Sequence, residues 1–130
     1  MNDYEYVMGF ITLGELPHED FIGEEKWLMV KHSIRGWELP GGKVKSGESN
    51  EEAIIREVCE EARVNSFVRQ EPKKYEKGLV YWLGVSGEVK PSELKRLDPI
   101  IDDVEWFSSP PTNLAWGIEE LKKIIKLFKH

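Results

Sequence analysis

The chain has 130 residues, the usual size of one compact domain and too few for two independent hydrophobic cores. Hydrophobic residues make up 40% of it and charged residues 32%, which is typical of a globular protein and excludes a disordered one. The net charge of -6 argues against binding to a nucleic-acid polymer, because such binding relies on Lys and Arg neutralising phosphates. We therefore predict a single domain over residues 1–130.

The cellular setting is predicted from what the amino-terminal half lacks. Cys59 is the only cysteine, so no internal disulfide is expected and a reducing compartment is favoured. Asp3 and Glu5 stand where a secretory signal would carry basic residues. No apolar run approaches the roughly 20 residues that cross a bilayer. We expect a cytoplasmic protein without a membrane partner, either a monomer or a homodimer.

The first elements are predicted to be strands and loops. Aromatic and β-branched residues over 4–13 predict a strand, and residues 26–31 predict its partner. A polar loop follows over 32–36. Residues 37–42 then form a brief extended piece that a proline and two glycines bring to an end.

The clearest helix is predicted over residues 49–62. Ser49 is a suitable cap, and Glu52 three residues later completes a capping box. One apolar stripe recurs at helical spacing, formed by Ile54, Ile55, Val58 and Ala62. The stripe predicts that this helix lies on a sheet.

Further strands and a second helix are expected in the carboxyl-terminal half. Residues 66–69 and 78–85 are predicted to pair, and 104–107 supply another strand. From Asn113 onward apolar residues follow helical spacing, with glutamates early and lysines late as the helix dipole favours. The element order predicts a mixed sheet with helices against its faces, an α/β or α+β sandwich.

Acidic residues gather on one side of the first helix. Glu57, Glu60 and Glu61 share that side because a helix has 3.6 residues per turn. Each like-charge pair costs roughly 0.2 to 0.5 kcal/mol unless a cation neutralises it. Oxygen ligands alone suit Mg²⁺ or Mn²⁺ rather than zinc. The alternative is an ordinary solvated acidic face.

Residues beside the acidic cluster favour the binding of an anionic ligand. Gly41 and Gly42 let the backbone approach a ligand closely, and Lys43 is a cation that can meet phosphate oxygens. Arg56 is placed to hold or orient a carboxylate. Taken singly, the glycine pair is a turn and Arg56 a surface arginine.

These residues fall into one spaced pattern. Gly42, five residues, Glu48, seven residues, Arg56-Glu57-Val58, one residue, and Glu60-Glu61 together resemble the Nudix box, the signature of hydrolases of nucleoside diphosphates linked to another moiety. The resemblance implies an α/β/α sandwich with a mixed β-sheet. Arg63 stands where the family has glycine, and left-handed backbone angles cost a non-glycine residue roughly 1 kcal/mol. We therefore expect the helix to run on and stop at Asn65.

The resemblance also implies how the reaction proceeds. Metal ligands would be the side chains of Glu57, Glu60 and Glu61 and the carbonyl of Gly41, binding Mg²⁺ or Mn²⁺, with Glu48 and Arg56 in support. Water would attack phosphorus, and its proton would pass to a base. Glu57 is the first candidate for this base, and the acids of a later segment are the others: Asp102, Asp103 and Glu105.

Substrate contacts lie outside the box and are predicted from weaker patterns. Asn113 ends a Pro-Pro-Thr-Asn element that resembles the MutT-like branch of the family, where it would hydrogen-bond a purine; the alternative is a helix cap. His32 and Arg35 are candidates for phosphate contacts, or else simply solvated. Four aromatic residues offer either a stacking wall or core packing: Trp82, Trp106, Phe107 and Trp116.

The resemblance therefore implies a hydrolase that cleaves a nucleoside triphosphate to a nucleoside monophosphate and pyrophosphate, with an oxidised purine such as 8-oxo-dGTP as substrate. The alternatives on the same scaffold are hydrolysis of ADP-ribose, a nucleotide sugar or a dinucleoside polyphosphate. A nucleotide-sensing module without turnover is the alternative from another class of protein. Three mutually repelling carboxylates argue against a pure binder.

Overall fold

The fold was analysed in a computed structural model, which describes residues 4–87 and 99–129. In these residues, a run of strands precedes each of the two helices. Their order is β1 (Tyr6–Ile11), β2 (Trp27–His32), β3 (Gly36–Glu38), β4 (Gly41–Lys43), α1 (Asn50–Ala62), β5 (Ser66–Val68), β6 (Lys73–Tyr75), β7 (Gly78–Val85), β8 (Ile101–Phe107) and α2 (Ile118–Phe128).

The larger sheet has five strands and mixed pairing. Its order is β4-β1-β7-β5, and β6 also pairs with β7. β1 and β7 are parallel, with Tyr6 opposite Gly78 and Ile11 opposite Leu83, whereas the other pairs are antiparallel. The predicted mixed sheet and the pairing of residues 66–69 with 78–85 are thus confirmed. β6 was not predicted, because its three residues are too few for a period to show.

The smaller sheet consists of β3, β2 and β8 in that order, all antiparallel. The prediction that residues 26–31 pair with the first strand was wrong. In the described part of the chain, β2 meets that segment only at an isolated bridge between Thr12 and Trp27. The partner of β2 on its other edge is β8, distant in sequence, with Val30 opposite Val104.

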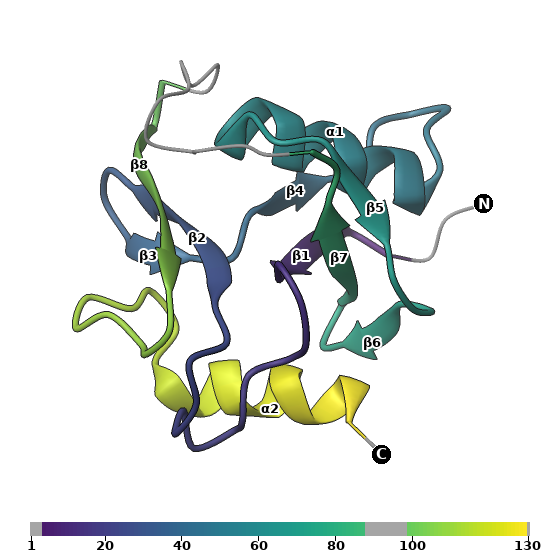
Figure 1. Cartoon of the computed structure of the whole chain (residues 1–130). Helices are drawn as coiled ribbons and strands as arrows, with labels where there is room; N and C mark the ends of the chain where they lie inside the picture. The colour runs from purple at the N-terminus through teal and green to yellow at the C-terminus, as the bar shows by residue number, and fades with distance from the viewer. Residues whose placement is uncertain (1–3, 88–98, 130) are drawn as a thin grey trace.

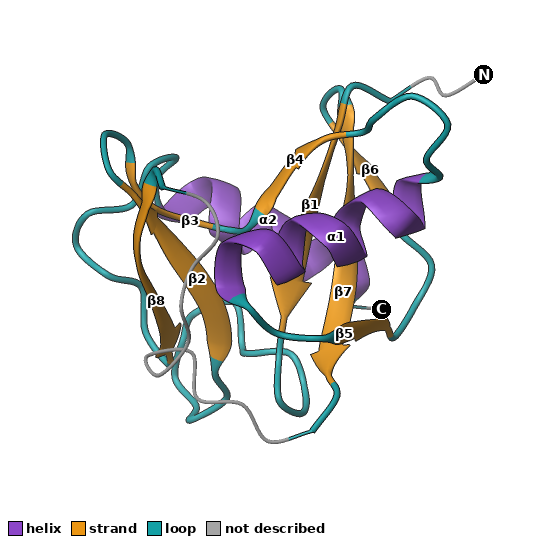
Figure 2. Ribbon diagram, turned by 90° about the horizontal axis from the view of Figure 1, so that it is seen from above, coloured by secondary structure: helices purple, strands orange, loops and turns teal. Residues whose placement is uncertain are grey.

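The two helices lie on opposite sides of the sheets, α1 above and α2 below in Figure 1, and Figure 2 shows the same layers from above. Side chains alternate between the two sides along β2. Leu28 and Val30 join the core under α1, and Trp27 and Met29 join the core over α2. This is the predicted α/β/α sandwich.

The extended piece predicted over residues 37–42 is divided between the two sheets. β3 belongs to the smaller sheet and β4 to the larger one, and the chain crosses at Leu39 and Pro40. The N–H of Gly9 donates to the carbonyl of Pro40 over 2.8 Å. A Cβ on Gly41 would overlap the carbonyl oxygen of Val7, so only glycine fits where β4 meets β1.

Helix α1 confirms the helix predicted over residues 49–62, but not its extension to Asn65. The Ser49 hydroxyl accepts the N–H of Glu52 at 3.0 Å, and the Glu52 carboxylate accepts the N–H of Ser49 at 2.8 Å. The helix does not run on to Asn65. Arg63 takes the left-handed conformation itself, with φ 58°, and its N–H donates to the carbonyl of Cys59 over 3.0 Å.

Helix α2 begins later than Asn113. Asn113 is not its cap, because the N-cap position is Gly117, with φ 88°. The segment around Asn113 instead hydrogen-bonds to Trp37 of β3. The carbonyl of Asn113 accepts the N–H of Trp37 at 2.8 Å, and the N–H of Ala115 donates to the carbonyl of Trp37 over 2.8 Å. Within residues 4–87 and 99–129, neither helix is long and apolar enough to cross a bilayer.

Candidate active site

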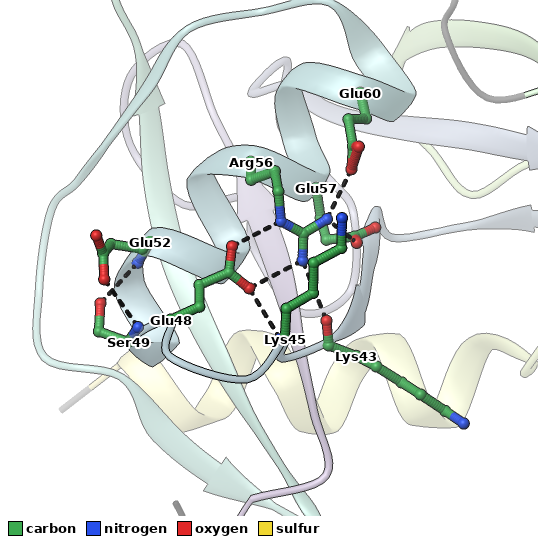
Figure 3. A network of polar contacts seen from close by, with 8 residues as sticks. All are labelled: Lys43, Lys45, Glu48, Ser49, Glu52, Arg56, Glu57 and Glu60. Carbon is green, nitrogen blue, oxygen red and sulfur yellow. Dashed lines mark hydrogen bonds and ion pairs between the residues drawn. The ribbon is translucent and has the colours of Figure 1, made fainter.

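Arg56 gathers three of the predicted carboxylates around one guanidinium. Its Nε lies 2.7 Å and its Nη2 3.0 Å from the two carboxylate oxygens of Glu48. Its Nη1 lies 2.5 Å from Glu57 and 2.7 Å from Glu60. Figure 3 shows the carboxylates pointing inward to the guanidinium from the loop and from successive turns of α1. The interpretation of Arg56 as an ordinary surface residue is therefore replaced by a structural role.

The network changes the proton affinity of its members. Hydrogen bonds from Arg56, and then from the backbone N–H of Lys45, lower the pKa of Glu48 to about 2. The hydrogen bond to Glu48 is also the main reason why the pKa of Arg56 is raised, and bonds to Glu57 and Glu60 add to it. Charge-assisted and bidentate hydrogen bonds are the strong ones in proteins. Glu48 therefore stays ionised down to a pH of about 2, and Arg56 stays charged far above neutral pH.

Each of the three residues of strand β4 lies against a side chain of α1. The N–H of Gly41 donates to the buried carboxylate of Glu61 over 2.8 Å. A Cβ on Gly42 would lie 2.5 Å from the carboxylate of Glu57, so this glycine leaves the room that Glu57 occupies. The carbonyl of Lys43 accepts Nη2 of Arg56 at 3.2 Å. Gly42 thus lets helix and strand approach closely, whereas Gly41 makes room for β1.

The donor atoms at this site suit a hard cation. Glu57 and Glu60 both contact the same positively charged group, Nη1 of Arg56. The atoms that they offer as metal ligands are carboxylate oxygens. In the described ranges, no three acidic, His or Cys side chains already converge as a metal cluster. Glu61 is instead engaged with β4. The residues fit a divalent cation by their chemistry, and Arg56 holds two of them at present.

A second ion pair lies on β3 and the loop before it. Nη2 and Nε of Arg35 lie 2.8 and 3.1 Å from the carboxylate of Glu38, which is buried. Nδ1 of His32 accepts the N–H groups of Ile34 and Arg35, each at 3.1 Å, so this imidazole shapes the loop that carries Arg35. Glu38 was not predicted as a functional residue, although it lies within the extended piece of residues 37–42 that also contains Gly41 and Gly42.

A cavity of about 230 Å³ is lined both by the Arg35–Glu38 ion pair and by strand β4. Arg35 and Glu38 line one part of it, and Gly41, Gly42 and Lys43 line another. The side chain of Lys43 points away from the carboxylates (Figure 3). The structure therefore brings two of the predicted phosphate-binding cations, Arg35 and Lys43, to one cavity beside the box. The other described residues that line this cavity lie outside the motif: Tyr6, Val7, Met8, Leu39 and Trp116.

The remaining candidates lie elsewhere. Asn113 packs against the β2–β3 hairpin, where a Cβ on Gly36 would lie 3.1 Å from its side-chain Oδ1. Asp102 and Glu105 are exposed on β8. Oδ1 of Asp103 accepts the N–H of Val104 at 2.8 Å. Which acid accepts the proton of water stays a prediction.

Two kinds of comparison identify the relatives of this chain. The family model described as NUDIX domain matches residues 21–128. A curated protein of Bacillus subtilis (strain 168), named "Putative 8-oxo-dGTP diphosphatase YtkD", is 58% identical over 44 residues, which cover 32% of this chain and 28% of that protein. The chain thus spans less than a third of the length of this relative.

Solved structures share the fold. The Bacillus subtilis pyrophosphohydrolase BsRppH is 20% identical with a TM-score of 0.65, over 98% of this chain and 83% of that one. A NUDIX-family hydrolase from Clostridium perfringens is 17% identical with a TM-score of 0.65, over 99% of this chain and 100% of that one. At such identities the likeness concerns the fold alone.

Proposed function

Because the chain belongs to the NUDIX family of pyrophosphohydrolases, we propose that it cleaves purine nucleoside triphosphates of the oxidised type, such as 8-oxo-dGTP, to a nucleoside monophosphate and pyrophosphate. The observation that carries this proposal is the position of Arg35 and Lys43 on a cavity that reaches Gly42, with the carboxylate of Glu57 directly behind that glycine. A triphosphate bound there would have its reacting phosphorus beside the acidic helix. The name of the Bacillus subtilis relative supports the choice of substrate.

Hydrolases of this family generally use divalent cations, and the residues here suit Mg²⁺ or Mn²⁺. Glu57, Glu60 and Glu61 would hold the ion, with the carbonyl of Gly41 as a possible backbone ligand. When bound, the ion neutralises phosphate charge and makes water a better nucleophile. We propose that Arg56 then keeps its bidentate bond to Glu48 and gives up part of its contact with Glu57 and Glu60.

The chain's own side chains supply the positioning. Arg35 and Lys43 would attract and orient the phosphates, and the ion pair with the buried Glu38 keeps the exposed guanidinium of Arg35 in place. Glu61 fixes β4 relative to α1. Glu57, which lies against Gly42, is the first candidate to accept the proton of the attacking water. The acids of β8 are the other candidates for this role.

A panel of nucleotides tests the proposal. Purified protein is incubated with 8-oxo-dGTP, dGTP, dATP, ADP-ribose, a nucleotide sugar and a dinucleoside polyphosphate, with Mg²⁺ and with a chelator. We expect pyrophosphate and a monophosphate from 8-oxo-dGTP at the highest kcat/KM of the panel, and only with the metal. If the protein cleaved only ADP-ribose, the nucleotide sugar or the dinucleoside polyphosphate, the proposed substrate would be wrong. Binding without any cleavage would favour the sensing module.

A further inference from the structure

His32 lies at the end of β2 and shapes the turn that leads to β3. It is buried between Gly36 of β3 and Ile101 of β8, its partners across the sheet. Its Nδ1 accepts the backbone N–H groups of both Ile34 and Arg35, each at 3.1 Å. A backbone N–H can only donate, so Nδ1 offers a lone pair to both. The imidazole in this arrangement is therefore neutral and has its proton on Nε2.

Arg35 is held at two points, one on its backbone and one on its side chain. His32 accepts its N–H, and the buried carboxylate of Glu38 accepts its guanidinium at 2.8 and 3.1 Å. The side chain of Arg35 is 57% exposed and lines the cavity beside the box. His32 is not among the described residues that line this cavity. Any influence of His32 on a ligand bound there therefore passes through Arg35.

We propose that His32 is a positioning residue whose neutral imidazole keeps Arg35 at the cavity, and that a proton taken up from solvent in mild acid releases Arg35 and weakens polyphosphate binding. Histidine is the side chain that ordinarily changes charge between about pH 5 and 8. A proton on Nδ1 turns the acceptor into a donor that faces two other donors, so both hydrogen bonds are lost. The turn then has to rearrange, because its two N–H groups lack an acceptor. The inference rests on the proposed function, in which Arg35 binds the phosphates.

Charged groups occur on each described element beside His32, and their titration has to be separated from its own. They are Lys31 on β2, Arg35 and Glu38 at β3, Asp102 and Asp103 on β8, and Glu61 of α1, whose charge acts on Arg35. All of them remain in His32→Asn. The Oδ1 of an asparagine accepts N–H groups of the following residues as Nδ1 does here, but it takes up no proton. A pH dependence that this variant loses therefore belongs to His32.

Calorimetric binding of inorganic triphosphate with Mg²⁺ tests the assignment without any turnover. Between about pH 8 and about pH 5.5, the Kd of wild type should rise at least about fivefold more than that of His32→Asn, since a hydrogen bond to a charged group contributes roughly tenfold in affinity. His32→Leu offers no acceptor, so it should bind as weakly as Arg35→Met at both pH values. His18→Asn is the matched control, because the exposed His18 accepts the N–H of Asp20 in another loop. It should behave as wild type.

Imidazole nitrogen NMR gives a second reading on the same protein without any ligand. At about pH 8, Nδ1 of His32 should have the chemical shift of an unprotonated nitrogen and Nε2 that of a protonated one. The amide signals of Ile34 and Arg35 should move on acidification with the same midpoint as the imidazole of His32.

Two results would overturn the assignment: an equal change of Kd with pH in wild type and His32→Asn, or an Nδ1 that carries the proton at about pH 8. If no nucleotide is hydrolysed but the two proteins differ as expected, the proposed reaction fails and the role of His32 stands. If 8-oxo-dGTP is hydrolysed and the two proteins do not differ, only the role of His32 fails.

Discussion

The two helices cover opposite faces of the same layer of sheet, and both bury an apolar side, but α1 also has a polar side that contacts a strand. The side of α1 toward β4 is polar: Arg56, Glu57 and Glu61 each meet one residue of the strand. α2 has no side-chain cap, and its inner face is apolar and buried. The residues of that face are Leu121, Ile124, Ile125 and Phe128.

This difference separates stability from chemistry. Hydrophobic burial is non-directional, so the α2 face needs only volume and shape to stabilise the fold. The α1 contacts are directional, and they hold charges next to one another at a cost that a bound cation would offset. Substitutions in the apolar face of α2 should therefore change stability, and substitutions on the polar side of α1 should change activity and the response to metal.

The largest stability effect is expected in α2. Ile125→Ala removes a fully buried side chain and leaves a cavity, which should lower the free energy of unfolding by about 3 kcal/mol. Denaturant titration measures this loss. Activity per folded molecule should stay unchanged below the transition. A large loss of kcat in the folded variant would show that α2 and the acidic site are not separable.

A smaller stability loss is expected from Arg56→Met, combined with a response to metal. The change leaves the carboxylates of Glu48, Glu57 and Glu60 without their shared cation, which should cost roughly 2 kcal/mol. Mg²⁺ should then raise the melting temperature of the variant more than that of the wild type, because the repelling charges have more to gain. Arg69→Met is the control, since this arginine stacks on Phe67 and Trp82 instead. If Mg²⁺ raised the melting temperatures of wild type, Arg56→Met and Arg69→Met equally, these carboxylates would not be the metal ligands.

The network should also appear in the pH dependence of stability. The pKa of Glu48 is lowered in the folded state from 4.5 to about 2. Its contribution is therefore fully present above pH 4.5 and is lost as the pH falls toward 2. Glu48→Gln should flatten the decline of the melting temperature between these values, whereas Glu51→Gln on the exposed side of α1 serves as the control. A decline as steep in Glu48→Gln as in the wild type would contradict the network.

The smallest effect concerns the end of α1. Arg63 has φ 58°, so Arg63→Gly relieves a left-handed strain while making the unfolded chain more flexible. A net gain of about 0.5 kcal/mol in the free energy of unfolding is expected. Arg63→Ala keeps the strain and should show no gain. If glycine destabilises the protein, the arginine side chain itself contributes to the helix end.

Local features of the fold were predictable and long-range pairings were not. The capping box of Ser49 and Glu52 and the apolar stripe of α1 depend on neighbours within one or two turns, so the sequence pattern contains them. The pairing of β2 with β8 depends on a distant segment. The same holds for Asn113, whose backbone carbonyl accepts a hydrogen bond from the distant Trp37. Helix α2 begins only at Ile118.

The candidate site divides in the same way. The spacing of Glu48, Arg56, Glu57 and Glu60 indicated that they belong together, because a helix brings such positions to one side. The cavity residues come from separate elements: Tyr6 from β1, Arg35 from a loop and Trp116 from the segment before α2. No local period connects them.

The central claim is that the carboxylates of α1 hold the metal that drives hydrolysis, and one variant tests it most directly. Steady-state release of pyrophosphate from 8-oxo-dGTP is measured with Mg²⁺ for wild type, Glu60→Gln and the matched control Glu51→Gln. We expect Glu60→Gln to lower kcat by about a hundredfold or more while the control keeps the wild-type rate. An unchanged rate in folded Glu60→Gln would contradict the claim.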